Sequence, residues 1–220
     1  MDFKRITIIA GHYGSGKTNI AINLAYELKK LHENVAIADA DIVNPYFRTK
    51  DSEKELHDAG IKLICSKYAN SNVDIPALPQ ELYSITDDSS LYAIMDIGGD
   101  DRGAYALGRF SKKIVEENNY EMLAVINQFR PLTMDAASAI SVMREIEAAA
   151  KMRFTGIINN SNLGVETTKE DVLSSLPYAR EVSEALHIPV KFTSVKEELY
   201  EELSKEIKNL FPLKLQSKIN

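Results

Sequence analysis

The sequence predicts an α/β fold: a three-layer, doubly wound and mostly parallel sheet of about seven strands with helices on both faces. Short apolar runs alternate with longer amphipathic stretches along the chain. Most of the apolar runs are continuous, as in strands that are buried on both sides. The chain has 220 residues, 45% of them hydrophobic, and no linker-like segment divides it. We therefore expect one domain over residues 1–220.

The expected strands are the apolar runs Arg5–Ala10, Val35–Asp39, Ile61–Cys65, Leu91–Ile97, Met122–Asn127, Thr155–Asn159 and Val190–Thr193. The expected helices are Lys17–Leu31, Ser52–Ala59, Ala104–Asn118, Thr133–Lys151, Lys169–Leu186 and Lys196–Leu210. In the first helix, apolar residues recur every three or four positions and form one face. Pro177 lies inside the fifth, where a proline breaks or kinks a helix.

Charge and cysteine content exclude several functional classes. The chain has 32 acidic and 26 basic residues, a net charge of −6, which argues against broad nucleic-acid binding. A single cysteine, Cys65, excludes an intramolecular disulfide and any Cys-x-x-Cys metal or redox site built from this chain alone. No apolar run approaches the roughly 18 residues of a membrane span, and no targeting segment stands out. We therefore expect a cytoplasmic protein without a membrane span.

A glycine-rich motif follows the first expected strand and opens the first expected helix. The pattern G-x-x-x-x-G-K-[ST] is matched in full by Gly11, His12, Tyr13, Gly14, Ser15, Gly16, Lys17 and Thr18. Such a loop cradles a polyphosphate with backbone N–H groups, while the lysine reaches the β- and γ-phosphates and the hydroxyl binds Mg²⁺. We therefore predict a nucleotide site formed by these eight residues and Asn19.

Aspartates lie where two further strands are expected to end. Asp39 and Asp41 end or follow the second strand, and Asp96 lies near the end of the fourth, two residues before a glycine pair that includes Gly99. In a doubly wound sheet, ligands gather at the carboxyl ends of the strands. We therefore predict that Thr18, Asp39 and Asp96 hold Mg²⁺. Asp39 and Asp41 are alternatively helix-capping acids in a turn, but their spacing beside the loop favours function.

This combination of motifs resembles the ParA/MinD branch of P-loop ATPases, among the CobQ/CobB/MinD/ParA nucleotide-binding domains and including the nitrogenase iron-protein type. The resemblance spans nearly the whole chain. It implies that Asp41 orients the attacking water and acts with Lys17 as a catalytic residue. It also implies that Asp96 lies on the metal side and that Gly99 contacts the γ-phosphate.

The same resemblance implies that Asn160 hydrogen-bonds adenine, since an amide offers the donor and the acceptor that an adenine edge requires. The run Asn159-Asn160-Ser161-Asn162 lacks the lysine and aspartate of the guanine-reading pattern N-K-x-D. The cofactors are therefore expected to be ATP and Mg²⁺. The alternative is that Asn160 only forms a turn.

Two departures from the family pattern affect the expected partners. Relatives commonly carry a second lysine early in the loop, which reaches the nucleotide of the partner in a homodimer. His12 stands at that position and is mostly neutral at pH 7, so it is a weaker cation. The chain also lacks a Cys pair, which excludes the electron-transferring and zinc-clasped relatives. A homodimer and a monomer both remain open.

Three segments carry less specific signals. Residues 67–90 form either a lid or effector surface or an ordinary crossover. Lys196–Leu210 is either a membrane-targeting helix or a helix docked on the sheet. Its glutamates favour docking, because they would repel anionic lipid. Arg130, at the end of a strand, faces either the nucleotide or a partner, unless Pro131 merely starts a helix.

The sequence leaves three functions open. The first is a Mg²⁺-dependent ATPase (a hydrolase) that acts as a nucleotide-dependent switch for an unidentified partner. The second is an ATP-dependent small-molecule ligase or kinase of the dethiobiotin-synthetase or cobyrinate-amidase type, with a pocket formed by Asn44–Lys50 and Lys67–Pro79. The third is a module that binds ATP with little hydrolysis.

Overall fold

The computed structural model describes residues 3–40, 52–65, 80–98 and 101–215. Within them, eight strands form one sheet in the order β3-β2-β4-β1-β5-β6-β7-β8, and every pairing is parallel. The strands are β1 (Ile6–Ala10), β2 (Val35–Ala40), β3 (Lys62–Ile64), β4 (Tyr92–Ile97), β5 (Tyr120–Ile126), β6 (Gly156–Asn159), β7 (Val190–Lys196) and β8 (Leu210–Leu213). The predicted doubly wound α/β fold is confirmed, with one strand more than expected.

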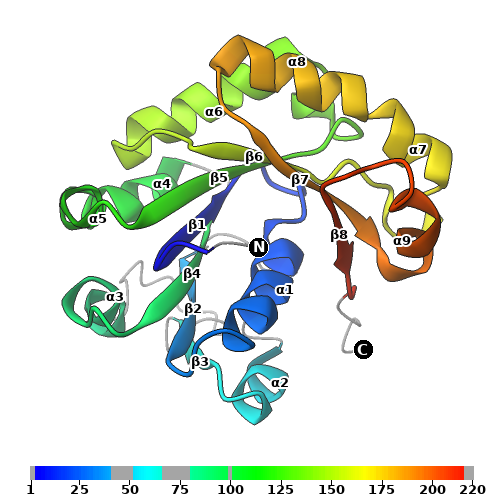
Figure 1. Cartoon of the computed structure of the whole chain (residues 1–220). Coiled ribbons are helices and arrows are strands. Elements are labelled where there is room, and N and C mark those ends of the chain that lie inside the picture. Colours follow the sequence, from blue (N-terminus) through cyan, green and yellow to red (C-terminus); the bar gives the residue numbers. More distant parts are fainter. Residues whose placement is uncertain (1–2, 41–51, 66–79, 99–100, 216–220) are drawn as a thin grey trace, which may run out of the picture.

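Helices cover both faces of the sheet (Figure 1). The helices are α1 (Lys17–Lys29), α2 (Glu53–Asp58), α3 (Tyr83–Asp87), α4 (Asp101–Gly108), α5 (Ser111–Glu117), α6 (Ala136–Ala150), α7 (Lys169–Ser174), α8 (Leu176–Leu186) and α9 (Glu197–Leu203). One core cluster joins α3–α6 and α8 to strand residues such as Ile8 and Met95. The other joins α1 and α2 to Ile9, Ile37 and Ile94. Because successive side chains alternate between faces, strands such as β1, β2 and β4 contribute to both clusters.

Two predicted helices are interrupted. The stretch expected as Ala104–Asn118 forms α4 and α5, separated by a turn in which the Phe110 N–H donates to the Leu107 carbonyl at 2.9 Å. The stretch expected as Lys169–Leu186 forms α7 and α8, with Pro177 in the first turn of α8. Proline is tolerated there because the first helical N–H groups have no partner within the helix. The predicted effect of Pro177 is therefore confirmed.

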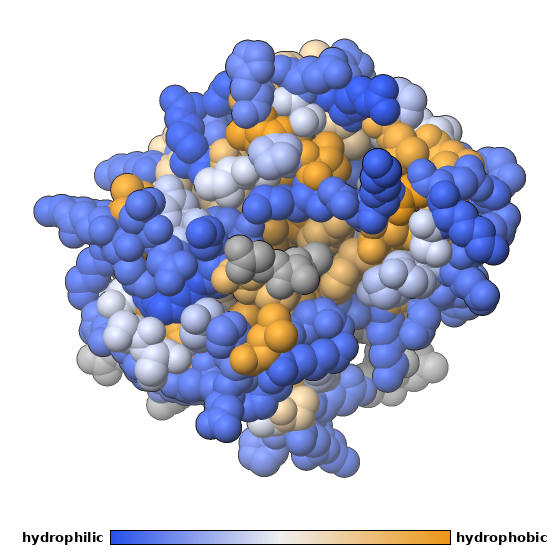
Figure 2. All heavy atoms as spheres, viewed as in Figure 1, coloured by the Kyte–Doolittle hydropathy of each residue, from blue (hydrophilic) through white to orange (hydrophobic). Residues whose placement is uncertain are grey.

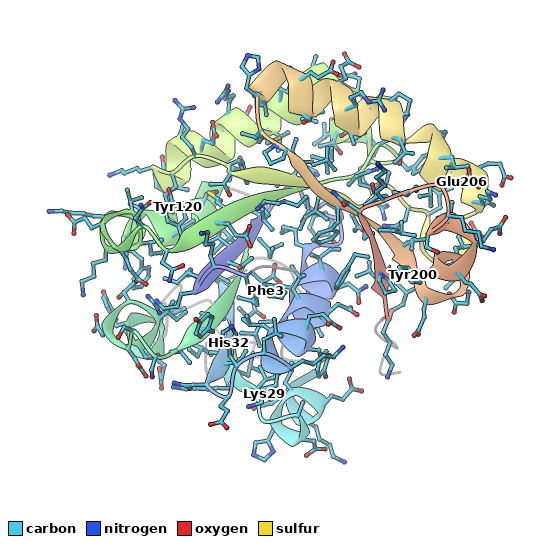
Figure 3. All side chains as sticks on the ribbon, in the orientation of Figure 1. Phe3, Lys29, His32, Tyr120, Tyr200 and Glu206 are labelled. Carbon is cyan, nitrogen blue, oxygen red and sulfur yellow. The ribbon has the colours of Figure 1, made fainter. Side chains whose placement is uncertain are left out.

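The prediction of a helix over Lys196–Leu210 was wrong in its second half. Helix α9 ends at Leu203, and Leu210 begins β8, which pairs with β7 at the edge of the sheet. Leu203 and Ile207 nevertheless pack into one small cluster, with Leu199 and Leu210 against it. A helix followed by a turn and a strand thus buries the same apolar side chains that one long helix would bury. The spacing of apolar residues in the sequence therefore did not distinguish the two structures. Tyr200 and Glu206 mark this region in Figure 3.

Polar side chains cover most of the face drawn in Figure 2, with apolar residues visible near its centre. None of the helices in the described ranges is long and apolar enough to cross a bilayer. Of residues 67–90, the structure describes 80–90, which form a short 3₁₀ turn (Gln80–Leu82) and α3. The remainder lies outside the described residues.

Candidate nucleotide-binding site

The glycine-rich loop connects β1 to α1 and packs tightly on its surroundings. Gly16 has a φ of 90°, a left-handed conformation that favours glycine. A Cβ at Gly16 would collide with the side-chain amide of Asn160, and one at Gly11 would collide with the Val125 carbonyl of β5. These two positions therefore require glycine, because the backbone lies directly against its neighbours.

The N-terminus of α1 is open toward this loop. Gly16 offers no side-chain cap, and the first turn of α1 contains no acidic residue. Side-chain caps are present at α6, where the Asp135 carboxylate accepts a hydrogen bond from the Ser138 N–H at 2.8 Å, and at α7, where Thr168 is the cap; among the described residues, α2, α3, α5, α8 and α9 have none. The first N–H groups and the positive dipole end of α1 thus form a ready binding site for an anion.

Lys17 adds a buried positive charge to this helix end. The residue is 4% exposed, and its Nζ donates to the His12 carbonyl at 3.4 Å. None of the ion pairs between described residues includes Lys17. Burying a cation at the positive end of a helix is unfavourable unless an anion compensates it. The charge distribution is therefore suited to a phosphate group.

The predicted metal ligands lie together beside Lys17. Asp39 of β2 and Asp96 of β4 are register partners on adjacent strands, and both are buried. They share the strand face of Ile37 and Ile94, which pack in the same cluster as α1. Thr18 of α1 donates its hydroxyl to Asp96 Oδ2 at 2.7 Å. A hydroxyl and two carboxylates are the hard oxygen ligands that Mg²⁺ prefers, so Thr18, Asp39 and Asp96 fit this ion.

The remaining residues of the predicted site differ in their exposure to solvent. His12 is half-buried, with its Nδ1 2.8 Å from the Tyr13 carbonyl oxygen. Tyr13 is exposed, as is Gly14. Ser15 is fully buried, and its hydroxyl has no hydrogen-bond partner among the described residues. Asn19 is half-buried in the first turn of α1.

Asn160 lies beneath the loop, immediately after β6. It is 3% exposed, its amide nitrogen donates to the Ser15 carbonyl at 2.6 Å, and its amide oxygen accepts from the Ser194 hydroxyl at 2.5 Å. The amide therefore links the loop to β7, and its predicted contact with adenine stays a prediction. Sequence reasoning missed Ser194, whose only signal is a hydroxyl near the carboxyl end of an apolar strand.

Arg130 approaches the loop from the turn after β5. Its Nε lies 3.7 Å from the position that a Cβ on Gly14 would occupy. Of the readings that the sequence left open, the structure shows that Pro131 starts a short 3₁₀ helix (Pro131–Thr133) and that the Arg130 side chain also lies against the loop; a role toward a nucleotide or a partner stays a prediction.

Several predicted residues lie outside the described residues. These are Asp41, Gly99, the segment Asn44–Lys50 and the segment Lys67–Pro79, whose roles stay predictions. In the part of the chain that is described, no group of three or more His, Cys, Asp or Glu side chains gathers to hold a metal ion. A magnesium ion in this site would therefore depend on nucleotide oxygens and water beside the three protein ligands.

Comparison with known families identifies the family of this chain. The sequence profile of the CobQ/CobB/MinD/ParA nucleotide binding domain matches residues 6–187, which include the loop, both aspartates and Asn160. The chain belongs to this family. The CobQ/CobB/MinD/ParA protein described here therefore has a nucleotide-binding domain with the P-loop NTPase fold. Comparison with curated proteins gives no significant match.

Solved structures with a similar fold include several FtsY proteins. FtsY from Mycoplasma mycoides has a TM-score of 0.58 at 22% identity, over 88% of this chain and 62% of that one. Chloroplast FtsY from Physcomitrella patens has a TM-score of 0.60 at 22% identity, over 90% and 60%. The signal recognition particle receptor FtsY from Elizabethkingia anophelis in complex with GDP has a TM-score of 0.51 at 16% identity, over 99% and 62%. The chain thus spans less than two thirds of their length, and at these identities the likeness concerns the fold.

Proposed function

We propose that the protein is a Mg²⁺-dependent ATPase that acts as a nucleotide-dependent switch, in the nitrogenase iron-protein-like part of the ParA/MinD branch. The observation that carries the proposal is buried Lys17 at the uncapped start of α1, beside the Thr18–Asp96 hydrogen bond. A nucleoside triphosphate supplies the anion that Lys17 lacks, and bound Mg²⁺ would offset the negative charge of Asp39 and Asp96.

We propose ATP as the nucleotide, although one of the similar folds is that of an FtsY in complex with GDP. The run that follows β6, Asn159–Asn162, has neither the lysine nor the aspartate of N-K-x-D. A guanine base would lack the carboxylate that this pattern provides. Selectivity between ATP and GTP is therefore the first property to measure.

In the proposed reaction, Asp41 accepts a hydrogen bond from a water molecule and directs it at the γ-phosphorus. A bond forms from the water oxygen to phosphorus as the bond to the β-phosphate oxygen breaks. The products are ADP and inorganic phosphate, and the proton of the water leaves to solvent. Lys17 stabilises the negative charge that develops on the transferred group. The chemistry thus needs no group beyond the predicted site and its cofactor.

Exposed apolar side chains favour a protein partner over a small-molecule substrate. Tyr13 in the loop, Leu132 and Met134 after β5, and Leu163 and Val165 after β6 are 45–78% exposed. All follow the carboxyl ends of parallel strands, so they lie at the edge of the sheet that carries the nucleotide site. Exposed apolar residues at the edge that carries the site are suited to an interaction surface, although others, such as Leu31 and Val115, are exposed elsewhere. A second copy of the chain and a different protein both fit this surface.

The test combines binding, hydrolysis and association. The wild-type protein is expected to bind Mg-ATP more tightly than Mg-GTP by calorimetry and to release phosphate slowly. Asp41→Asn is expected to bind ATP and lose hydrolysis. Absence of nucleotide binding would contradict the proposal. Fast turnover that requires an added small carboxylic acid or amine would favour the ligase, and binding without phosphate release would favour the passive module.

A further inference from the structure

A second cation faces the loop from the turn that follows β5, and a hydrogen-bond network holds this turn in place. Asn127 is 1% exposed. Its side-chain oxygen accepts from the Phe129 N–H at 2.9 Å, and its backbone carbonyl accepts from the Arg130 N–H at 3.2 Å and the Thr133 hydroxyl at 2.7 Å. The Tyr178 hydroxyl in turn donates to the Thr133 carbonyl at 2.7 Å. The backbone of Arg130 is thus anchored to the core.

The side chain of Arg130 extends from this turn to the loop. Its Nε and Cδ lie 3.7 and 3.9 Å from the position of a Cβ on Gly14. Arg130 is exposed, and among the described residues its guanidinium forms no hydrogen bond or ion pair. Arg130 is thus a cation held on an anchored turn against the loop; unlike buried Lys17 it is exposed to solvent, so its guanidinium is accessible to a ligand on the loop.

The chemistry of the guanidinium fits a phosphate chain. Arginine stays charged at all physiological pH values and presents parallel N–H groups that bind two phosphate oxygens at once. Lys17 is the only lysine or arginine in the loop sequence, residues 11–18. Mg-ATP is net negative, so a second fixed cation on the loop favours its binding.

We propose that Arg130 binds the phosphate chain of the nucleotide from the Gly14 side of the loop, within the same protomer. This inference rests on the proposed function, because it requires that the loop binds a nucleotide. The alternative is that the Arg130 side chain only covers the loop backbone and contributes to its packing.

The experiment measures Mg-ATP and Mg-GTP binding by calorimetry for the wild type and for Arg130→Ala, Arg130→Lys and Arg180→Ala. Arg180 is an exposed arginine of α8, and its substitution by alanine removes the same charge from an element outside the loop. Loss of a charge-assisted hydrogen bond lowers affinity by about tenfold or more. We expect this loss in Arg130→Ala for both nucleotides, with their affinity ratio unchanged, partial recovery in Arg130→Lys, and wild-type affinity in Arg180→Ala.

Two results would overturn the assignment. One is ATP affinity within about twofold of the wild type in Arg130→Ala. The other is an equal loss in Arg130→Ala and Arg130→Lys together with a lower unfolding temperature without nucleotide, which would show a packing role. The proposed function fails separately: if the wild type binds neither nucleotide, or Lys17→Ala binds ATP as the wild type does, the loop is not a nucleotide site.

Discussion

Buried charges are partnered differently at the two edges of the sheet: the amino edge, where the parallel strands begin, and the carboxyl edge, where they end. At the amino edge, buried charges meet partners from the same chain: Arg5 pairs with Glu117, Glu121 with Lys191, and Glu147 with Arg144 and Arg153. At the carboxyl edge, Lys17 is just as buried and has one distant carbonyl. The first edge is completed by folding, whereas the second requires a ligand to compensate its charge.

Arg5 shows how completely the amino edge is satisfied. It is 3% exposed, and both Nε and Nη2 donate to the Glu117 carboxylate. Its Nη1 donates to the carbonyls of Ile85 and Leu91 at 2.9 and 2.8 Å. Nearby, His32 (Figure 3) stacks on Tyr92 with ring centroids 3.5 Å apart. The comparison teaches that burial alone does not mark a functional charge; at the carboxyl edge the distinguishing feature is that Lys17 forms no ion pair with any described residue, although Asp39 and Asp96 are buried at the same edge.

The largest expected effect is on binding at the carboxyl edge. Lys17→Ala is expected to lower ATP affinity about a hundredfold or more, because a buried charge contact is lost. The unfolding free energy without nucleotide is expected to stay constant or rise by up to about 1 kcal/mol, since a buried cation without a counter-ion is removed. Calorimetry and urea unfolding measure the two quantities, with the exposed Lys30→Ala as control. A stability loss above about 2 kcal/mol would contradict the comparison.

At the amino edge we expect the opposite result: a substitution should lower stability and leave ATP affinity unchanged. Glu117→Ala leaves the Arg5 guanidinium without its carboxylate and is expected to lower the unfolding free energy by about 2 kcal/mol. Glu117 is 30% exposed in its side chain, so water limits the loss. ATP affinity is expected to equal that of the wild type. The neighbouring Glu116→Ala, whose ion pair with Lys112 is exposed, should change stability by less than about 0.5 kcal/mol.

A smaller effect tests the link between the loop and β7. Asn160→Ala removes the hydrogen bond to the Ser15 carbonyl and is expected to weaken ATP and GTP binding alike, about tenfold. Ser194→Ala should act in the same direction with a smaller loss, because it frees the amide oxygen of Asn160 without removing the contact to the loop. If Asn160→Ala weakened ATP binding and left GTP binding unchanged, the residue would read adenine.

The smallest expected effect is the pH dependence of the amino edge. Burial raises the pKa of Glu147, but the Phe154 N–H and the guanidiniums of Arg144 and Arg153 outweigh it and hold the pKa below its ordinary 4.5. The resulting stability is present in full above pH 4.5 and is lost as the pH falls through the lower, folded-state value.

Glu147→Gln is therefore expected to cost about 1 kcal/mol at pH 7, and the difference from the wild type should shrink below pH 4.5. Unfolding in urea between pH 7 and pH 3 measures this trend. Glu145→Gln, an exposed neighbour on α6, is the control and should show no such convergence. A difference that stays constant down to pH 3 would contradict a contribution from the ionised carboxylate, because glutamine preserves the packing of the side chain.

Much of the fold was predictable because strands buried on both faces leave continuous apolar runs. The same logic failed at Leu210, where an apolar spacing of three and four residues served a turn and a strand as well as a helix. It also failed near Phe110, where α4 ends at Gly108 and α5 begins at Ser111; a glycine inside an apolar helical pattern is compatible with either a continuous helix or a break. The local sequence pattern does not show which of two arrangements of the apolar residues can pack against the neighbouring elements.

The sequence by itself determined the nucleotide loop, because Gly11, Gly16, Lys17 and Thr18 are required by backbone conformation and charge within one short segment. It also determined that Asp39 and Asp96 lie near the carboxyl ends of their strands. Only the tertiary structure decided that these two aspartates are register partners beside Thr18, that Asn160 bonds the loop and Ser194, and that Arg130 reaches Gly14. Those contacts join residues distant in the chain, and they exist only once strand order and register bring the carboxyl ends of the strands together.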